Sequence, residues 1–142
     1  MPLRLAAIEA EVFVVEIPSI LKYTFLLHFI ACIIFGFLFF LSPEFYVDVA
    51  AWPFLDPAAG RVMGSGFLGF GFAALFGYRA ASWEEVKIVV IGDIVFTLFA
   101  LVSSVWMMIV HTTIPILAGA FNASLFALFF VLFLYSYYVA TR

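Results

Sequence analysis

Two ionisable side chains, His28 and Asp93, interrupt long apolar stretches of this 142-residue chain. An ionisable residue within a membrane-spanning segment is costly and marks a candidate functional site. His28 lies about nine residues into the first stretch and Asp93 about six into the third, at comparable depth if both stretches are parallel helices. We expect the two to meet, and such a pair could bind a proton, a polar head group or a cation. The structural alternative is a buried hydrogen bond that fixes helix register, or an Asp93 that reaches toward Lys87 or Arg79.

A second polar group gathers near the other end of the stretches. It consists of Arg61, His111, Asn122, Ser103 and Ser104. Arg61 either extends to the membrane interface or closes a cavity over the helix ends. The two histidines lie too far apart along the spans to hold one haem. No metal-ligand cluster, nucleophile elbow or phosphate-binding loop is present in the sequence, which therefore predicts no catalytic residue and no metal site and leaves any cofactor unknown.

Four apolar stretches position these residues: Ser19–Leu41, Gly60–Tyr78, Ile88–Val110 and Ile114–Tyr138. About 20 mainly apolar residues cross a hydrocarbon core, and 68% of the chain is hydrophobic whereas 11% is charged. The chain is therefore predicted to be an all-α integral membrane protein, a four-helix bundle with up-down-up-down topology, over residues 19–142. Residues 1–18 are expected to form a membrane-proximal tail or a poorly amphipathic surface segment. Because there is no run of Lys and Arg, nucleic acid is not expected as a partner.

Local motifs mark the ends of the spans. Asp56 and Pro57 predict an N-cap and first-turn proline for the second helix. Ser82 and Glu85 have the spacing of a capping box. Pro43 is expected to close the first helix, and the connection 42–59 to lie along the interface and contain a short helix. Thr113 with Pro115 predicts the start of the fourth helix, and the short connection before it makes the last two helices antiparallel neighbours.

The distribution of basic residues predicts the orientation. The side that holds both termini carries five basic residues and the opposite side carries only Arg61. By the positive-inside rule, both termini of this multi-pass protein of the cell membrane are expected in the cytoplasm.

Small residues indicate which helix faces pack together, since helices in lipid associate through close contact and interhelical hydrogen bonds. The second span has an i, i+4 stripe of Ser65, Gly69, Ala73 and Gly77, with Gly60 and Gly64 beside its start, and the fourth has Gly119, Ala123 and Ala127. The corresponding residues of the first span are Thr24, His28, Cys32 and Gly36, and those of the third span are Asp93, Thr97, Ala100 and Ser104. These stripes predict a small-residue interior and an exterior of Phe and Leu. The alternative is that one stripe, that of the second span, pairs with another protomer.

The segment Gly60-Arg61-Val62-Met63-Gly64-Ser65-Gly66-Phe67-Leu68-Gly69-Phe70-Gly71 resembles the second helix of the small DoxX-like membrane proteins of bacteria and archaea. Chain length, helix count and the longer first connection are also similar. The resemblance implies a four-helix bundle and, in some members, service as the membrane subunit of a quinone-linked oxidoreductase. Arg61, Gly64 and Gly69 match family positions, and the resemblance implies no catalytic role for them.

Three functions fit these features. The sequence favours a membrane subunit without its own catalytic centre, which forms homo-oligomers or serves other membrane subunits in the lipid bilayer. The second is a carrier of a small solute, an ion or a proton through His28 and Asp93. The third is a binder of quinone, pigment or lipid between the helices, with His28, Asp93 or Arg61 as the polar anchor.

Overall fold

The computed structural model of the protein describes residues 16–53 and 56–142. These residues form five helices: α1 (Ser19–Leu41), α2 (Pro43–Ala50), α3 (Pro57–Arg79), α4 (Trp83–Val110) and α5 (Ile116–Ala140). Four of them, α1, α3, α4 and α5, are long and apolar enough to cross a membrane. The predicted all-α membrane bundle is therefore confirmed. The expectation for the N-terminal tail falls almost entirely on residues outside the described part.

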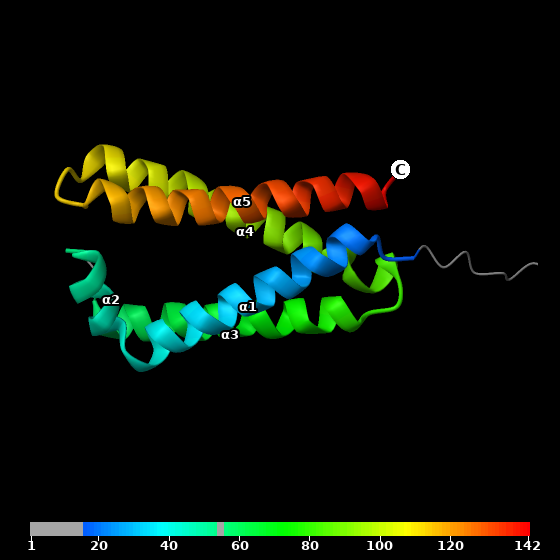
Figure 1. Ribbon diagram of the computed structural model, residues 1–142, viewed down its shortest axis with the longest axis horizontal. Coiled ribbons are helices and arrows are strands. Elements are labelled where there is room, and N and C mark those ends of the chain that lie inside the picture. The colour runs from blue at the N-terminus through cyan, green and yellow to red at the C-terminus, as the bar shows by residue number, and fades with distance from the viewer. Residues whose placement is uncertain (1–15, 54–55) are drawn as a thin grey trace, which may run out of the picture.

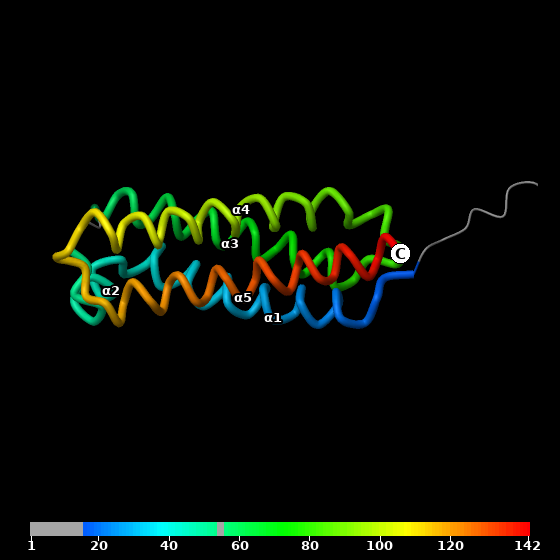
Figure 2. Tube along the Cα trace, turned by 90° about the horizontal axis from the view of Figure 1, so that it is seen from above, coloured from blue at the N-terminus to red at the C-terminus, as the bar shows by residue number. Residues whose placement is uncertain are grey.

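The four long helices form two antiparallel pairs (Figures 1 and 2). Helix α1 packs mainly on α3, and α4 packs mainly on α5. The first pair runs alongside the second, and the amino end of α1 leans toward the carboxyl end of α5, near the end of the bundle that holds the C-terminus (Figure 1). The short helix α2 lies at the opposite end. We call these the terminal end and the α2 end. The up-down-up-down order predicted from the sequence is what the structure has.

The helix ends agree with most of the predicted motifs. Asp56 caps α3, because its Oδ1 accepts a hydrogen bond of 2.9 Å from the amide of Ala59. Ser82 precedes α4 but does not complete a capping box. Its hydroxyl instead donates to the Glu85 carboxylate at 2.8 Å, and no side-chain cap bond is made to the helix backbone.

Glycines bring α3 into direct backbone contact with α1. A Cβ atom on Gly64 would clash with the backbone of Phe40 and lie 2.8 Å from the carbonyl oxygen of Gly36. A Cβ on Gly71 would lie 3.1 Å from the Cβ of Cys32, and one on Gly77 would meet the ring of Phe25 at 2.6 Å. Residues 64 and 71 are seven apart and so drift by only about 20° around a helix. They therefore form one continuous seam.

The predicted rotation of the second span about its own axis is wrong, because the seam places a different face of α3 toward the interior. Ser65 and Gly69 were expected to face the interior, but both are exposed, and a Cβ on Gly69 would meet nothing within 4 Å. At 3.6 residues per turn, a stripe that advances by four residues winds about 40° per step. The stripe consequently starts on the outside at Ser65, passes Ala73 half-buried, and reaches the interior at Gly77.

The expected exterior of phenylalanines is also only partly correct. Several are exposed, but Phe25, Phe39, Phe129 and Phe133 are buried. The α4–α5 pair does pack closely at a small residue, because a Cβ on Gly119 would meet the side chain of Met108 at 2.5 Å. Ala123, on the same stripe, is half-buried. Between the two pairs, aromatic rings occupy much of the interior, for example Phe25 against Phe133 and Phe70 against Phe96.

Candidate functional site

His28 on α1 and Asp93 on α4 meet between the two helix pairs. The His28 Nδ1 atom lies 3.7 Å from Asp93 Oδ2, and the side chains are 4% and 1% exposed. Asp93 is ten residues beyond the start of α4 at Trp83, about 15 Å along the helix. The predicted approach of these residues is confirmed. Lys87, the alternative partner of Asp93, pairs with Glu84 instead.

The pair is not satisfied by the rest of the protein. At 3.7 Å the contact is longer than a hydrogen bond. Within the described part of the chain, His28 Nδ1 and both carboxylate oxygens of Asp93 are buried without a hydrogen-bond partner. Buried polar groups are almost always paired, so three unpaired buried atoms in one place are unusual.

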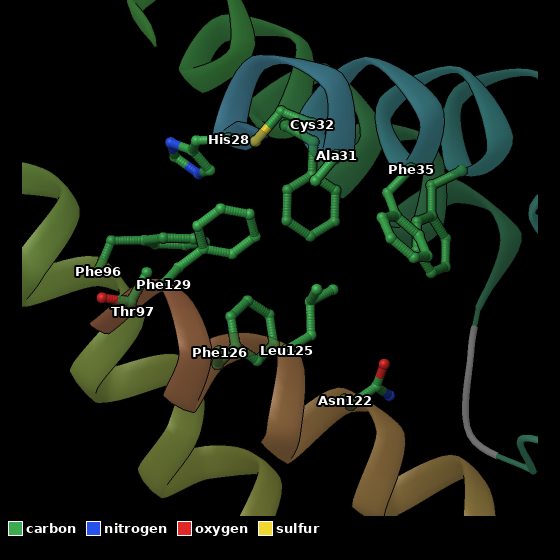
Figure 3. A pocket seen from close by; sticks show the side chains of 12 residues that line it. His28, Ala31, Cys32, Phe35, Phe96, Thr97, Asn122, Leu125, Phe126 and Phe129 are labelled. Atoms are coloured by element: carbon green, nitrogen blue, oxygen red, sulfur yellow. The ribbon is translucent and has the colours of Figure 1, made fainter. Parts of the chain in front are cut away.

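His28 also lines an inner chamber of about 40 Å³. Figure 3 shows His28 and Cys32 projecting from α1 and Phe129 from α5 around this space. The His28 ring packs on Phe129 at 4.8 Å and on Phe133 at 5.1 Å between centroids. A water molecule occupies about 30 Å³ of liquid, so the chamber has room for a small polar group and not for a ring.

An outer chamber of about 310 Å³ continues from the inner one toward the α2 end. The two share five lining residues: Phe39, Phe67, Phe96, Asn122 and Phe126. Its volume is at the lower limit of the range for small-molecule sites. Phe96 stacks on Phe70 at 4.5 Å and meets Phe126 edge-on at 6.1 Å, so the walls are aromatic. Ser103 and Ser104 add hydroxyl groups at the outer part.

Helix α2 and the residues after it lie against the outer chamber through Tyr46 and Trp52. The Tyr46 hydroxyl donates to Asn122 Oδ1 at 3.2 Å and accepts from Asn122 Nδ2 at 2.9 Å. Burial raises the pKa of Tyr46, against the opposing effect of the Asn122 hydrogen bond. The hydroxyl therefore stays protonated at neutral pH and can both donate and accept. Its ring also packs on Phe39 and Trp52.

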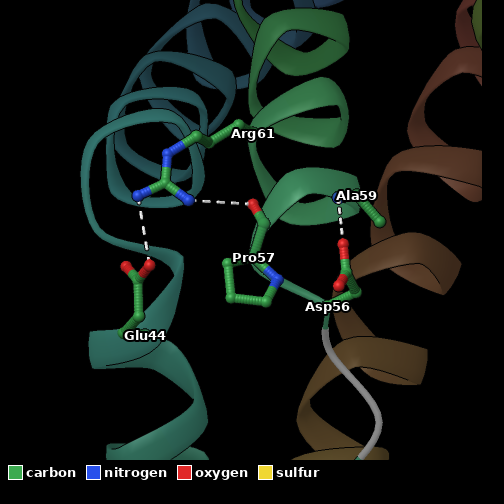
Figure 4. A network of polar contacts seen from close by, with 5 residues as sticks. All are labelled: Glu44, Asp56, Pro57, Ala59 and Arg61. Atoms are coloured by element: carbon green, nitrogen blue, oxygen red, sulfur yellow. Dashed lines mark hydrogen bonds and ion pairs between the residues drawn. The ribbon is translucent and has the colours of Figure 1, made fainter.

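An ion pair connects α2 to α3 on the surface. Arg61 donates to Glu44 Oε1 at 3.1 Å and to the carbonyl oxygen of Pro57 at 3.1 Å (Figure 4). The pKa of Glu44 is lowered by its backbone hydrogen bond at the start of α2 and, to a smaller extent, by Arg61. Arg61 thus extends along the surface and does not line either chamber.

The other predicted site residues divide between the cavity and the surface. Asn122, Ser103 and Ser104 line the outer chamber, and Ser104 also donates to the carbonyl oxygen of Ala100 at 2.8 Å. His111 is half-buried at the end of α4 and does not line the cavity.

Sequence reasoning missed Tyr46 and the aromatic walls. The lone Asn122 in an apolar span needed a polar partner, which was a usable signal for Tyr46.

Among residues 16–53 and 56–142, no three His, Cys, Asp or Glu side chains are grouped so that they could hold a metal ion.

Comparison with known proteins adds no identification. No family model matches the chain, and no curated protein or solved structure matches it.

Proposed function

We propose that this membrane protein binds a flat, apolar small molecule with a polar group at one end, between its two helix pairs. The single observation that carries the proposal is the orphaned His28–Asp93 pair at the inner end of an aromatic cavity. Apolar walls with a few convergent polar groups are typical of small-molecule sites. Quinones, pigments and some lipids have the required form, and membership of the DoxX-like group is a proposal compatible with such a ligand.

The size of the two chambers supports this orientation of the ligand. The ring system would occupy the outer chamber, against the wall formed by Phe67, Phe96 and Phe126, and its polar end would enter the inner chamber at His28. Asn122 lines both chambers and would contact the junction. The proposal concerns binding alone.

The test is to purify the protein in lipid nanodiscs and to identify co-purifying organic molecules by mass spectrometry and absorption spectroscopy. Ala100 lines the outer chamber, so Ala100→Phe would place a ring in it. Leu98→Phe is the matched control, because Leu98 is on the same helix and 39% exposed. We expect a stoichiometric ligand in the wild type and in Leu98→Phe, and its loss in Ala100→Phe. Equal amounts in all three, or none in the wild type, would contradict the proposal.

A second candidate function, assembly with another copy or another membrane subunit, has its own observation. Ser65, Gly66 and Gly69 form an exposed small-residue surface on α3, and a Cβ on either glycine would meet nothing within 4 Å. Such surfaces allow helices in lipid to approach closely.

Disulfide cross-linking in membranes tests this assembly. In a Cys32→Ser background, Gly69→Cys should form a covalent dimer on mild oxidation. Ala74→Cys should not, because Ala74 is fully buried in the core of the protein. A monomer in both variants would count against self-association through this surface.

A further inference from the structure

His28 stands between Asp93 and the cavity. Its Nδ1 atom faces Asp93 at 3.7 Å and is fully buried, while the ring lines the inner chamber. Asp93 is not among the residues that line the chamber. The nitrogen on the other side of the ring, Nε2, is therefore the polar atom left for a ligand, and Asp93 acts on the ligand only through His28.

The surroundings of the pair determine its protons. Both side chains are buried, the ring is packed on Phe129 and Phe133, and neither makes a second ion pair within the described residues. A net charge in such a place is strongly disfavoured, so the pair is most stable when neutral overall.

A neutral pair carries two protons. They are arranged either as a carboxylic acid with a neutral imidazole or as a carboxylate with an imidazolium. When one proton lies between Oδ2 and Nδ1, the second is on Nε2 in both arrangements. The ring then presents an N–H donor to the inner chamber.

We propose that the site selects ligands with a hydrogen-bond acceptor, a carbonyl oxygen, at the end that enters the inner chamber. The inference rests on the proposed function and names the chemical class of its ligand. A carbonyl group fits a chamber of about 40 Å³, and a flat ring attached to it would lie in the outer chamber, against the aromatic wall that Phe96 and Phe126 form. Asp93 is a positioning residue that fixes which nitrogen of His28 carries the proton.

The protein contains a built-in reporter for the site. Cys32 is the single cysteine of the chain and lines the inner chamber beside His28. Its rate of modification by methyl methanethiosulfonate, a small unbranched thiol reagent, should fall in nanodiscs when the chamber is occupied. Two probes differ only at the polar end: 2-acetylnaphthalene has a C=O group where 2-isopropenylnaphthalene has C=CH₂.

We expect the ketone to protect Cys32 at about fivefold lower concentration than the alkene, the effect of one ordinary hydrogen bond. The preference should persist in Asp93→Asn, because the amide can donate to Nδ1 and keep the proton on Nε2. It should disappear in His28→Phe. Equal protection by both probes would overturn the inference while leaving the cavity as a binding site. No protection by either would overturn the proposed function with it.

A second measurement does not depend on a ligand or on the reactivity of Cys32. In His111→Gln protein, ¹⁵N labelling of histidine reports His28 alone, since the chain has two histidines. We expect a protonated Nε2 in the wild-type pair and in Asp93→Asn, and a mixture of tautomers in Asp93→Val. A bare Nε2 with a protonated Nδ1 in the wild-type pair would overturn the inference.

Discussion

Tyr46 and Asn122, which are 76 positions apart in the chain, exchange hydrogen bonds of 3.2 and 2.9 Å. The contact joins α2 to α5, and therefore one helix pair to the other, beside the outer chamber. At the terminal end, Thr24 and Ser136 make a corresponding polar contact of 3.4 Å between α1 and α5. One phenol and one amide thus connect α2 to the second helix pair, in addition to the ion pair that connects it to α3.

The first prediction concerns this contact. Tyr46→Phe removes the hydroxyl and leaves the half-buried Asn122 amide without its partner, at a cost of about 1–3 kcal/mol. Amide hydrogen exchange over residues 43–50 should become faster by one to two orders of magnitude, while exchange in the middle of α1 stays the same. Tyr23→Phe is the control, since Tyr23 is 69% exposed. Unchanged exchange in α2 would show that the hydrogen bond does not hold the helix.

The second prediction concerns the ion pair between Glu44 and Arg61. Because the pKa of Glu44 is lowered in the folded protein, its stabilising contribution is complete above the ordinary carboxyl pKa of about 4.3. It is lost as the pH falls through the lower folded value. Protection of α2 amides, corrected for intrinsic exchange, should therefore drop at acidic pH in the wild type.

In Glu44→Gln the acid-induced drop should be absent, and protection should be low throughout. Glu84→Gln serves as control, because Glu84 pairs with Lys87 at the other end of the bundle. A drop of the same size in Glu44→Gln would assign the effect to another group.

The bounds of the helices could be predicted from the sequence, but the rotation of each helix about its own axis could not. Hydropathy and caps locate α1 at Ser19–Leu41 and place the other ends within a few residues, because span length and helix start are local properties. On α3, however, two small-residue faces compete. The face with Gly64 and Gly71 wins because it meets Gly36 and Cys32 of α1, and that choice depends on a neighbour distant in sequence.

The third prediction tests this seam with two glycines of the same helix. Gly64→Ala should destabilise the protein by about 1–3 kcal/mol, because the new methyl group would overlap the α1 backbone. Gly69→Ala should leave stability unchanged or raise it by less than about 1 kcal/mol, since its surroundings are open. Reversible unfolding in mixed micelles measures both. Equal effects would mean that the helix is rotated differently.

The fourth prediction separates binding from stability at the polar pair. Asp93→Val removes two orphaned oxygens and should stabilise the fold by about 1–3 kcal/mol while it reduces the ketone preference, because only part of the His28 population then carries its proton on Nε2. Thr97→Val should instead destabilise the fold, because the Thr97 hydroxyl already donates a hydrogen bond to the backbone carbonyl of Asp93 at 2.6 Å. Thermal unfolding in nanodiscs distinguishes them. A large loss of stability in Asp93→Val would identify Asp93 as structural.

The part of the candidate site that depends only on how deep a residue lies in its membrane span could be predicted. His28 and Asp93 could be paired from their positions in two parallel spans, and the structure brings them together. Arg61 could not be assigned in the same way, because its long side chain can extend toward the cavity or the surface. Its partner, Glu44, lies in a short helix whose placement depends on Tyr46 and Asn122. The aromatic cavity was missed because a Phe facing lipid and a Phe facing a cavity look the same in sequence.

The unequal packing of the helices has one further consequence. Helices α3 and α4 make far fewer contacts with each other than either makes within its own pair, and the cavity lies between the pairs. A molecule dissolved in the membrane could reach the outer chamber from the side, between α3 and α4, without entering water. Occupancy of the site would then follow the mole fraction of the ligand in the surrounding lipid, and its aqueous solubility would be irrelevant.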